Sequence, residues 1–115
     1  MINIDALKNL LLKDFKSDFV DELVDNNFCF VGDQPSVRMI GEIKSTLSVR
    51  IKSMERASLK IIGVDDLFLK FKQFKDSDSL FCYGVTNNKY IGNVYLKNDT
   101  DEVIGYDFVP KRNKI

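Results

Sequence analysis

The chain has 115 residues, of which 44% are hydrophobic and 30% are charged. This length and composition suit one folded domain with its own core, so we expect a single domain over residues 1–115 and not a disordered chain. The 17 lysines and arginines balance the 17 aspartates and glutamates, which argues against a general polyanion binder.

The first part of the chain predicts two amphipathic helices. Residues 4–16 repeat apolar side chains at the spacing of one helical face. Ser17 and Asp18 are residue types that cap a second helix, which Asn26 and Asn27 would end. We expect the apolar face of each helix to pack on the core.

The segment after Gly32–Pro35 is ambiguous. Its apolar residues between 37 and 54 fit one long helix, but Leu47–Lys52 alternates strictly and is rich in β-branched residues. A glycine inside a helix costs about 1 kcal/mol relative to alanine. We therefore favour a short helix or irregular strand over 36–44, followed by a strand over 46–52.

From residue 58 onward the apolar period is two, which is typical of strands. We expect strands over 58–64, 67–74, 80–86, 90–97 and 102–109. The polar turns between them are too short for crossover helices, so the strands pair antiparallel. The predicted fold is α+β, with N-terminal helices packed on one face of an antiparallel sheet of about five strands.

No catalytic machinery is recognisable in the residue types. There is no histidine, so a Ser-His or Cys-His pair and the common zinc sites cannot form. Cys29 and Cys82 each stand between aromatic residues, where a cysteine behaves as a small buried hydrophobe. Acidic clusters such as Asp65-Asp66 are interpreted as turn residues. We expect no enzyme activity, no metal site and no cofactor.

The N-terminus has no basic region followed by an apolar run. We therefore expect neither a signal peptide nor a membrane span, and a location in the cytoplasm.

Charge is unevenly distributed along the chain and suggests two candidate surfaces. Residues 1–33 carry 3 basic and 7 acidic groups, residues 34–75 carry 9 and 4, and residues 76–115 carry 5 and 6. The basic middle predicts a sheet face that combines cations with aromatic rings, Phe68, Lys70, Lys72 and Phe74. The acidic start predicts a second surface, Asp14, Asp18, Asp21, Glu22 and Asp25.

The C-terminal part of the sequence resembles a known family. Ser79–Gly84, Ile91–Leu96 and Asp99–Ile104 are similar to the strand and hairpin pattern of bacterial immunity proteins of the SUKH type. The resemblance covers about a third of the chain, and no functional residue transfers from it. It implies a cytoplasmic α+β protein that binds a partner toxin domain and neutralises it by occlusion.

Three functions remain open at this point. The first is a protein-binding inhibitor resembling an immunity protein, whose acidic surface would suit a basic nuclease. The second is a nucleic-acid-binding domain that uses the basic, aromatic-bearing sheet face. The third is a small enzyme or ligand-binding barrel that uses carboxylates and tyrosines. The sequence names neither the partner nor the oligomeric state.

Overall fold

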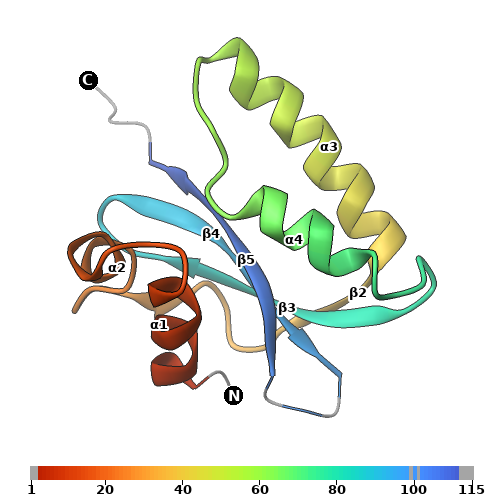
Figure 1. Ribbon diagram of the computed structural model, residues 1–115, viewed down its shortest axis with the longest axis horizontal. Helices are drawn as coiled ribbons and strands as arrows, with labels where there is room; N and C mark the ends of the chain where they lie inside the picture. Colours follow the sequence, from red (N-terminus) through yellow and green to blue (C-terminus); the bar gives the residue numbers. More distant parts are fainter. Residues whose placement is uncertain (1–2, 99, 101, 112–115) are drawn as a thin grey trace.

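A computed structural model describes residues 3–98, 100 and 102–111, and within them the chain forms four helices and five strands (Figure 1). The helices are α1 (Ile4–Leu12), α2 (Ser17–Leu23), α3 (Ile40–Arg56) and α4 (Val64–Phe71). The strands are β1 (Cys29–Phe30), β2 (Ser36–Met39), β3 (Ser79–Thr86), β4 (Tyr90–Lys97) and β5 (Val103–Pro110). The predicted α+β class and the antiparallel sheet of five strands are confirmed.

Three long C-terminal strands form the centre of the sheet. β3, β4 and β5 pair in sequence order, and β1 and β2 both pair with the free side of β3. All pairings are antiparallel, and a bulge at Tyr95/Leu96 shifts the register between β4 and β5. The strands predicted over 80–86, 90–97 and 102–109 are confirmed to within one residue at each end.

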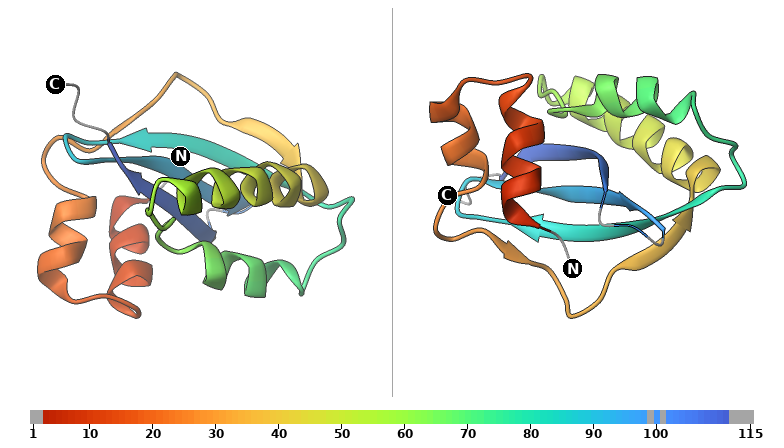
Figure 2. Two further views of the ribbon diagram at one scale, coloured as in Figure 1. Left: turned by 90° about the horizontal axis from the view of Figure 1, so that it is seen from above. Right: turned by 60° about the horizontal axis from the view of Figure 1, so that its bottom comes forward.

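Helices cover both faces of this sheet, so the prediction of helices on one face is wrong. Leu80 and Tyr95 belong to the core cluster beneath α3 and α4, whereas Val85 and Val94 belong to the cluster beneath α1 and α2. Successive side chains of a strand point to opposite faces, which separates the two clusters. The right-hand view of Figure 2 shows α3 and α4 together above the strands.

The first two helices agree with the prediction except at their ends. Asn3 caps α1, and its side-chain oxygen accepts hydrogen bonds from the backbone N–H groups of Asp5 and Ala6. Ser17 is the first residue of α2 instead of its cap, and Lys16 takes the cap position without a side-chain bond.

The strand predicted over 46–52 is wrong, because this segment belongs to α3. The short strand or helix expected over 36–44 is split between β2 and the start of α3. Ile43 and Leu47 are buried at helical spacing, whereas Val49, which would share a strand face with Leu47, is 70% exposed. The long-helix alternative is therefore the one the chain adopts.

The strands predicted over 58–64 and 67–74 are also wrong. Ile62 makes only an isolated bridge to Phe108, and the chain then turns into α4. Within α4, Leu67 and Phe71 are buried, whereas Leu69 between them is 61% exposed. Burial thus follows the helical period and not the period of two.

Gly63 makes the turn from the bridge into α4. Its φ is +88°, a left-handed conformation that glycine adopts without strain. A Cβ at this position would lie 2.7 Å from the ring of Tyr106. This close approach sets α4 directly beside β5.

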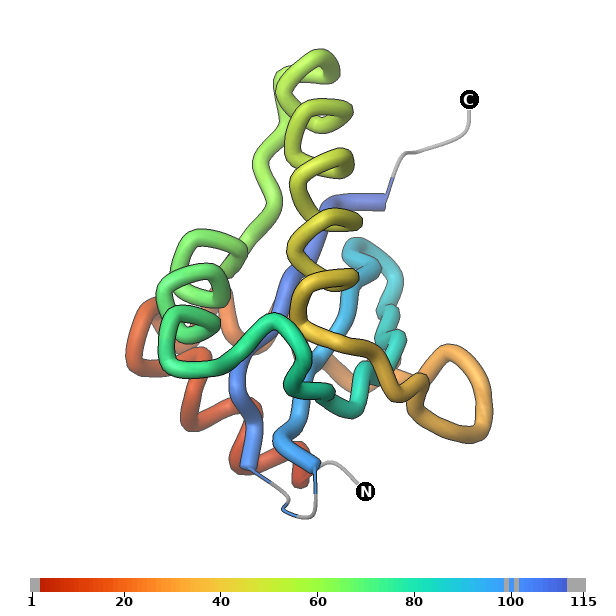
Figure 3. The backbone as a smooth tube through the Cα atoms, turned by 90° about the vertical axis from the view of Figure 1, so that its right-hand side faces the viewer, coloured from red at the N-terminus to blue at the C-terminus, as the bar shows by residue number. Residues whose placement is uncertain are grey.

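α4 therefore lies near the N-terminal helices, and β5 runs past both. Figure 3 shows α4 (green) beside the N-terminal helices (red), with β5 (blue) next to them. None of the helices in the described part of the chain is long and apolar enough to cross a membrane.

Candidate functional site

The acidic residues predicted as one surface lie on α2 and its two flanking turns. Asp14 lies in the turn before α2, Asp18, Asp21 and Glu22 lie on α2, and Asp25 follows it. The first four are exposed, and the helix buries Val20 and Leu23 on its other side. We call Asp18, Asp21 and Glu22 the acidic face of α2.

A buried asparagine holds the end of α2 against the sheet. Asn87 is 3% exposed, and its side-chain amide donates to the carbonyl oxygens of Glu22 (2.7 Å) and Leu23 (2.9 Å). Its own side-chain oxygen accepts from the N–H groups of Lys89 (2.8 Å) and Tyr90 (2.7 Å). These four bonds give the acidic face a defined orientation. From the sequence, this position was expected only to lie in the short polar turn between the strands over 80–86 and 90–97.

The basic residues predicted as a sheet face do not form one. Phe68 and Lys70 lie on α4, Lys72 is the C-cap of this helix, and Phe74 lies in the turn that follows. Phe68 and Phe74 are partly buried and pack against the core cluster that contains Phe71. The predicted platform of cations and open aromatic rings is therefore wrong, because its premise was a strand over 67–74.

Another basic residue, Arg50, neutralises a buried carboxylate. Asp107 is fully buried, and its Oδ1 lies 3.0 Å from Nη1 of Arg50. Its Oδ2 accepts a hydrogen bond from the Tyr95 hydroxyl at 2.5 Å, and Asn93 donates to both oxygens at 3.3 and 3.4 Å. Burial, and then the nearby Asp107 charge, raise the pKa of Tyr95. This network fastens α3 to the sheet, and it was not predicted from the sequence.

The two cysteines differ in their surroundings. Cys82 is buried, as expected, and burial raises the pKa of its thiol to about 12. Cys29 is exposed, so the expectation that it is buried is wrong. Cys29 is therefore the more reactive thiol of the two.

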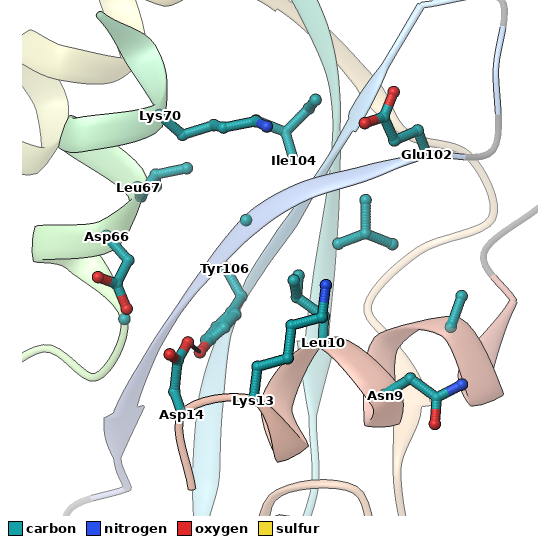
Figure 4. Close-up of a pocket in the computed structure, with 14 residues that line it drawn as sticks. Asn9, Leu10, Lys13, Asp14, Asp66, Leu67, Lys70, Glu102, Ile104 and Tyr106 are labelled. Atoms are coloured by element: carbon teal, nitrogen blue, oxygen red, sulfur yellow. Dashed lines mark hydrogen bonds between the residues drawn. The ribbon is translucent and has the colours of Figure 1, made fainter.

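A groove of about 560 Å³ lies between α1 and α4, with β5 along its floor (Figure 4). This volume is within the range of small-ligand pockets. Its aliphatic walls come from all three elements and include Leu10, Leu67 and Ile104. Its polar lining comprises Asn9, Lys13, Asp14, Asp66, Lys70, Glu102 and Tyr106.

One end of the groove is acidic. The Tyr106 hydroxyl donates to Oδ2 of Asp14 at 3.2 Å, and Asp66 faces the same point from α4. Burial, and then the Asp14 carboxylate, raise the pKa of Asp66 above its ordinary value of 3.8. Burial, followed by the same carboxylate, also raises the pKa of Tyr106. Two negative charges are thus held close together at this end.

No cation within the described residues forms an ion pair with either carboxylate. The ion pairs found there are Lys44–Asp76 and Arg50–Asp107, both outside the groove. In Figure 4 the side chain of Lys70 extends toward Ile104 and Glu102, away from Asp66. The described residues also contain no cluster of three or more side chains suited to hold a metal ion.

The groove combines one residue from each of the two predicted surfaces, Asp14 and Lys70. From the sequence, these two residues were expected on alternative interfaces, and neither Asp66 nor Tyr106 was among the predicted partner-binding residues. Asp65 and Asp66, interpreted as turn residues, form the first turn of α4. An acidic pair after a glycine is a typical helix start, which is the signal that could have located them.

Comparison with known protein families, curated proteins and solved structures finds no match to this chain. The resemblance to SUKH-type immunity proteins therefore stays a prediction.

Proposed function

We propose that this protein is a binding module that inhibits a basic partner protein by occlusion, in the manner of an immunity protein that neutralises a toxin domain. The observation that carries the proposal is the acidic face of α2. Asp18, Asp21 and Glu22 are exposed together on one short helix, and neither a side-chain hydrogen bond nor an ion pair within the described residues occupies them.

The physical basis is electrostatic steering. Clustered like charges attract an oppositely charged surface and speed its association, and they disfavour partners of the same sign. Because Asn87 anchors the end of α2, little ordering is needed on binding. The mechanism requires no chemistry in this chain: a bound partner loses access to its own active site.

Two observations favour this function over nucleic-acid binding. The segment 67–74, predicted as a strand that presents cations and aromatic rings, lies in helix α4 and the turn after it. Its residues Phe68 and Phe74 pack against the core. The exposed surface of α2 is negative and would repel a phosphate backbone.

The test is capture of the partner by two charge-matched variants. The first neutralises the acidic face as Asp18→Asn, Asp21→Asn and Glu22→Gln. The control changes three exposed acids elsewhere in the chain by the same net charge, as Asp33→Asn in the loop before β2 and Glu42→Gln and Glu55→Gln on α3. Each immobilised protein is exposed to extract of the source cells at low and at high salt.

We expect one protein to be retained by the wild type and the control, and its affinity for the first variant to be about tenfold lower, because several surface ion pairs are lost together. Adding the purified wild-type chain in equimolar amount should abolish the partner's activity. Equal capture by both variants, or a partner whose activity does not change, would contradict the proposal.

A further inference from the structure

The acidic end of the groove holds two charges that the described residues do not neutralise. Asp14 approaches from the turn after α1 and Asp66 from α4, and no lysine or arginine of the described chain pairs with them. Burial, and then the neighbouring Asp14 carboxylate, raise the pKa of Asp66. A cation placed between the two carboxylates would relieve their repulsion.

The groove beside these carboxylates suits an alkyl chain. Leu10 lines it from α1, Leu67 from α4 and Ile104 from β5. The side chains of lysine and arginine combine an aliphatic stem with a cationic head, and such stems bury well along apolar surfaces. A groove with aliphatic walls and two carboxylates at one end therefore matches the side chain of a lysine or an arginine.

We propose that the groove receives a lysine or arginine side chain of the partner protein, with its cationic head between Asp14 and Asp66 and its stem along Leu10 and Leu67. This inference rests on the proposed function, since it names the anchor by which a basic partner docks. The acidic face of α2 would attract the partner, and the groove would hold it.

The geometry also gives the groove a direction. The Tyr106 hydroxyl donates to Asp14 and so orients its carboxylate at the acidic end. Lys13 and Lys70 lie along the rest of the groove. Their charges disfavour a cation at that end and attract the carbonyl oxygens of the segment that carries the anchoring side chain.

The test uses short capped peptides as probes and does not require the partner. Amide shifts of the ¹⁵N-labelled chain are followed while Gly-Lys-Gly, Gly-Arg-Gly and Gly-norleucine-Gly peptides are titrated. We expect the lysine and arginine peptides to shift the amides of Asp14, Asp66 and Tyr106, with dissociation constants on the order of 1 mM. The norleucine peptide, which has the stem without the charge, should bind at least about tenfold more weakly.

Variants locate the site. Asp14→Asn with Asp66→Asn should weaken binding of the lysine peptide by about tenfold. Asp33→Asn with Glu42→Gln removes the same charge from exposed positions outside both the groove and the acidic face of α2, and it should leave the affinity within about twofold. Asparagine at position 14 still accepts the Tyr106 hydrogen bond, so the fold is retained.

Three results would overturn the inference: binding of norleucine equal to that of lysine, shifts confined to residues outside the groove, or Mg²⁺ shifting the same amides when the basic peptides do not. If the peptides fail but neutralising the acidic face still weakens partner capture, the groove inference is wrong and the proposed function stands. If the peptides bind the groove but no partner depends on the acidic face, the proposed function fails alone.

Discussion

Replacing Arg50 by methionine leaves the buried Asp107 carboxylate without its cationic partner. Asp107 is fully buried and lies 3.0 Å from the Arg50 guanidinium, whose side chain is 28% exposed. Removing one member of a buried ion pair costs about 3–5 kcal/mol, because the remaining charge stays desolvated. A small domain has a total stability of about 5–15 kcal/mol, so this variant should lose a large part of it.

Replacing the other member of the ion pair, Asp107, should reduce the free energy of unfolding by less. In Asp107→Asn the partly exposed Arg50 can turn toward water, and the new amide still accepts from Tyr95, so we expect a loss of about 1–3 kcal/mol. The double variant should be more stable than Arg50→Met alone, because it holds no unpaired buried charge. The coupling energy between Arg50→Met and Asp107→Asn in a double-mutant cycle should be at least about 1 kcal/mol.

Urea unfolding followed by circular dichroism measures these differences. Lys44→Met is the matched control, since Lys44 lies on the same helix and forms an ion pair with Asp76 at 2.7 Å, but that pair is exposed. We expect the control to lose less than about 1 kcal/mol. If Arg50→Met loses no more than Lys44→Met, the reasoning on the buried pair is refuted.

Three further predictions concern the site and its support. Asn87→Ala removes four hydrogen bonds, two of them to the end of α2, and should cost about 2–4 kcal/mol in urea unfolding, with faster hydrogen exchange in α2; unchanged exchange there would contradict the anchoring role. A thiol reagent should label Cys29 in the native protein and reach Cys82, whose pKa is about 12, only on unfolding, so two rapidly labelled thiols would refute the burial of Cys82. The pKa of Asp66 is raised above 3.8 by burial and then by Asp14, so its ionised form disfavours folding as the pH rises. Asp66→Asn should therefore raise the melting temperature at pH 7 and have no effect below about pH 3.8; a lower melting temperature at pH 7 would contradict this.

The last of these predictions also bears on function. A residue that reduces stability at neutral pH is often kept for binding or catalysis. An Asp66→Asn variant that is more stable and no longer binds the lysine peptide would show that Asp66 reduces stability and supports binding.

The errors made from the sequence have a common physical origin. In residues 46–52 and 67–74, apolar side chains occur both at alternate positions, as in a strand, and at the spacing of a helical face. The decision between them depends on which side chains a neighbouring element buries. Val49 and Leu69 fit the strand pattern but remain exposed, since the sheet buries only the helical faces of α3 and α4.

The same limit applies to the site. The acidic residues of α2 could be selected from charge alone, because a short helix with one apolar side must expose the other. Asp66 and Tyr106 could not, since they are 40 residues apart in the numbering of the chain and meet Asp14 only when α4 lies beside β5.

The sequence by itself determined the class of the fold, the two N-terminal helices, the three long strands and the acidic surface of α2. These features follow from local periodicity, turn residues and charge, which each segment carries alone. Only the tertiary structure decided that α3 and α4 are helices, that both faces of the sheet are covered, and that Asp14, Asp66 and Tyr106 line one groove. Those outcomes depend on burial against residues distant in the chain, and local pattern carries no information about such contacts.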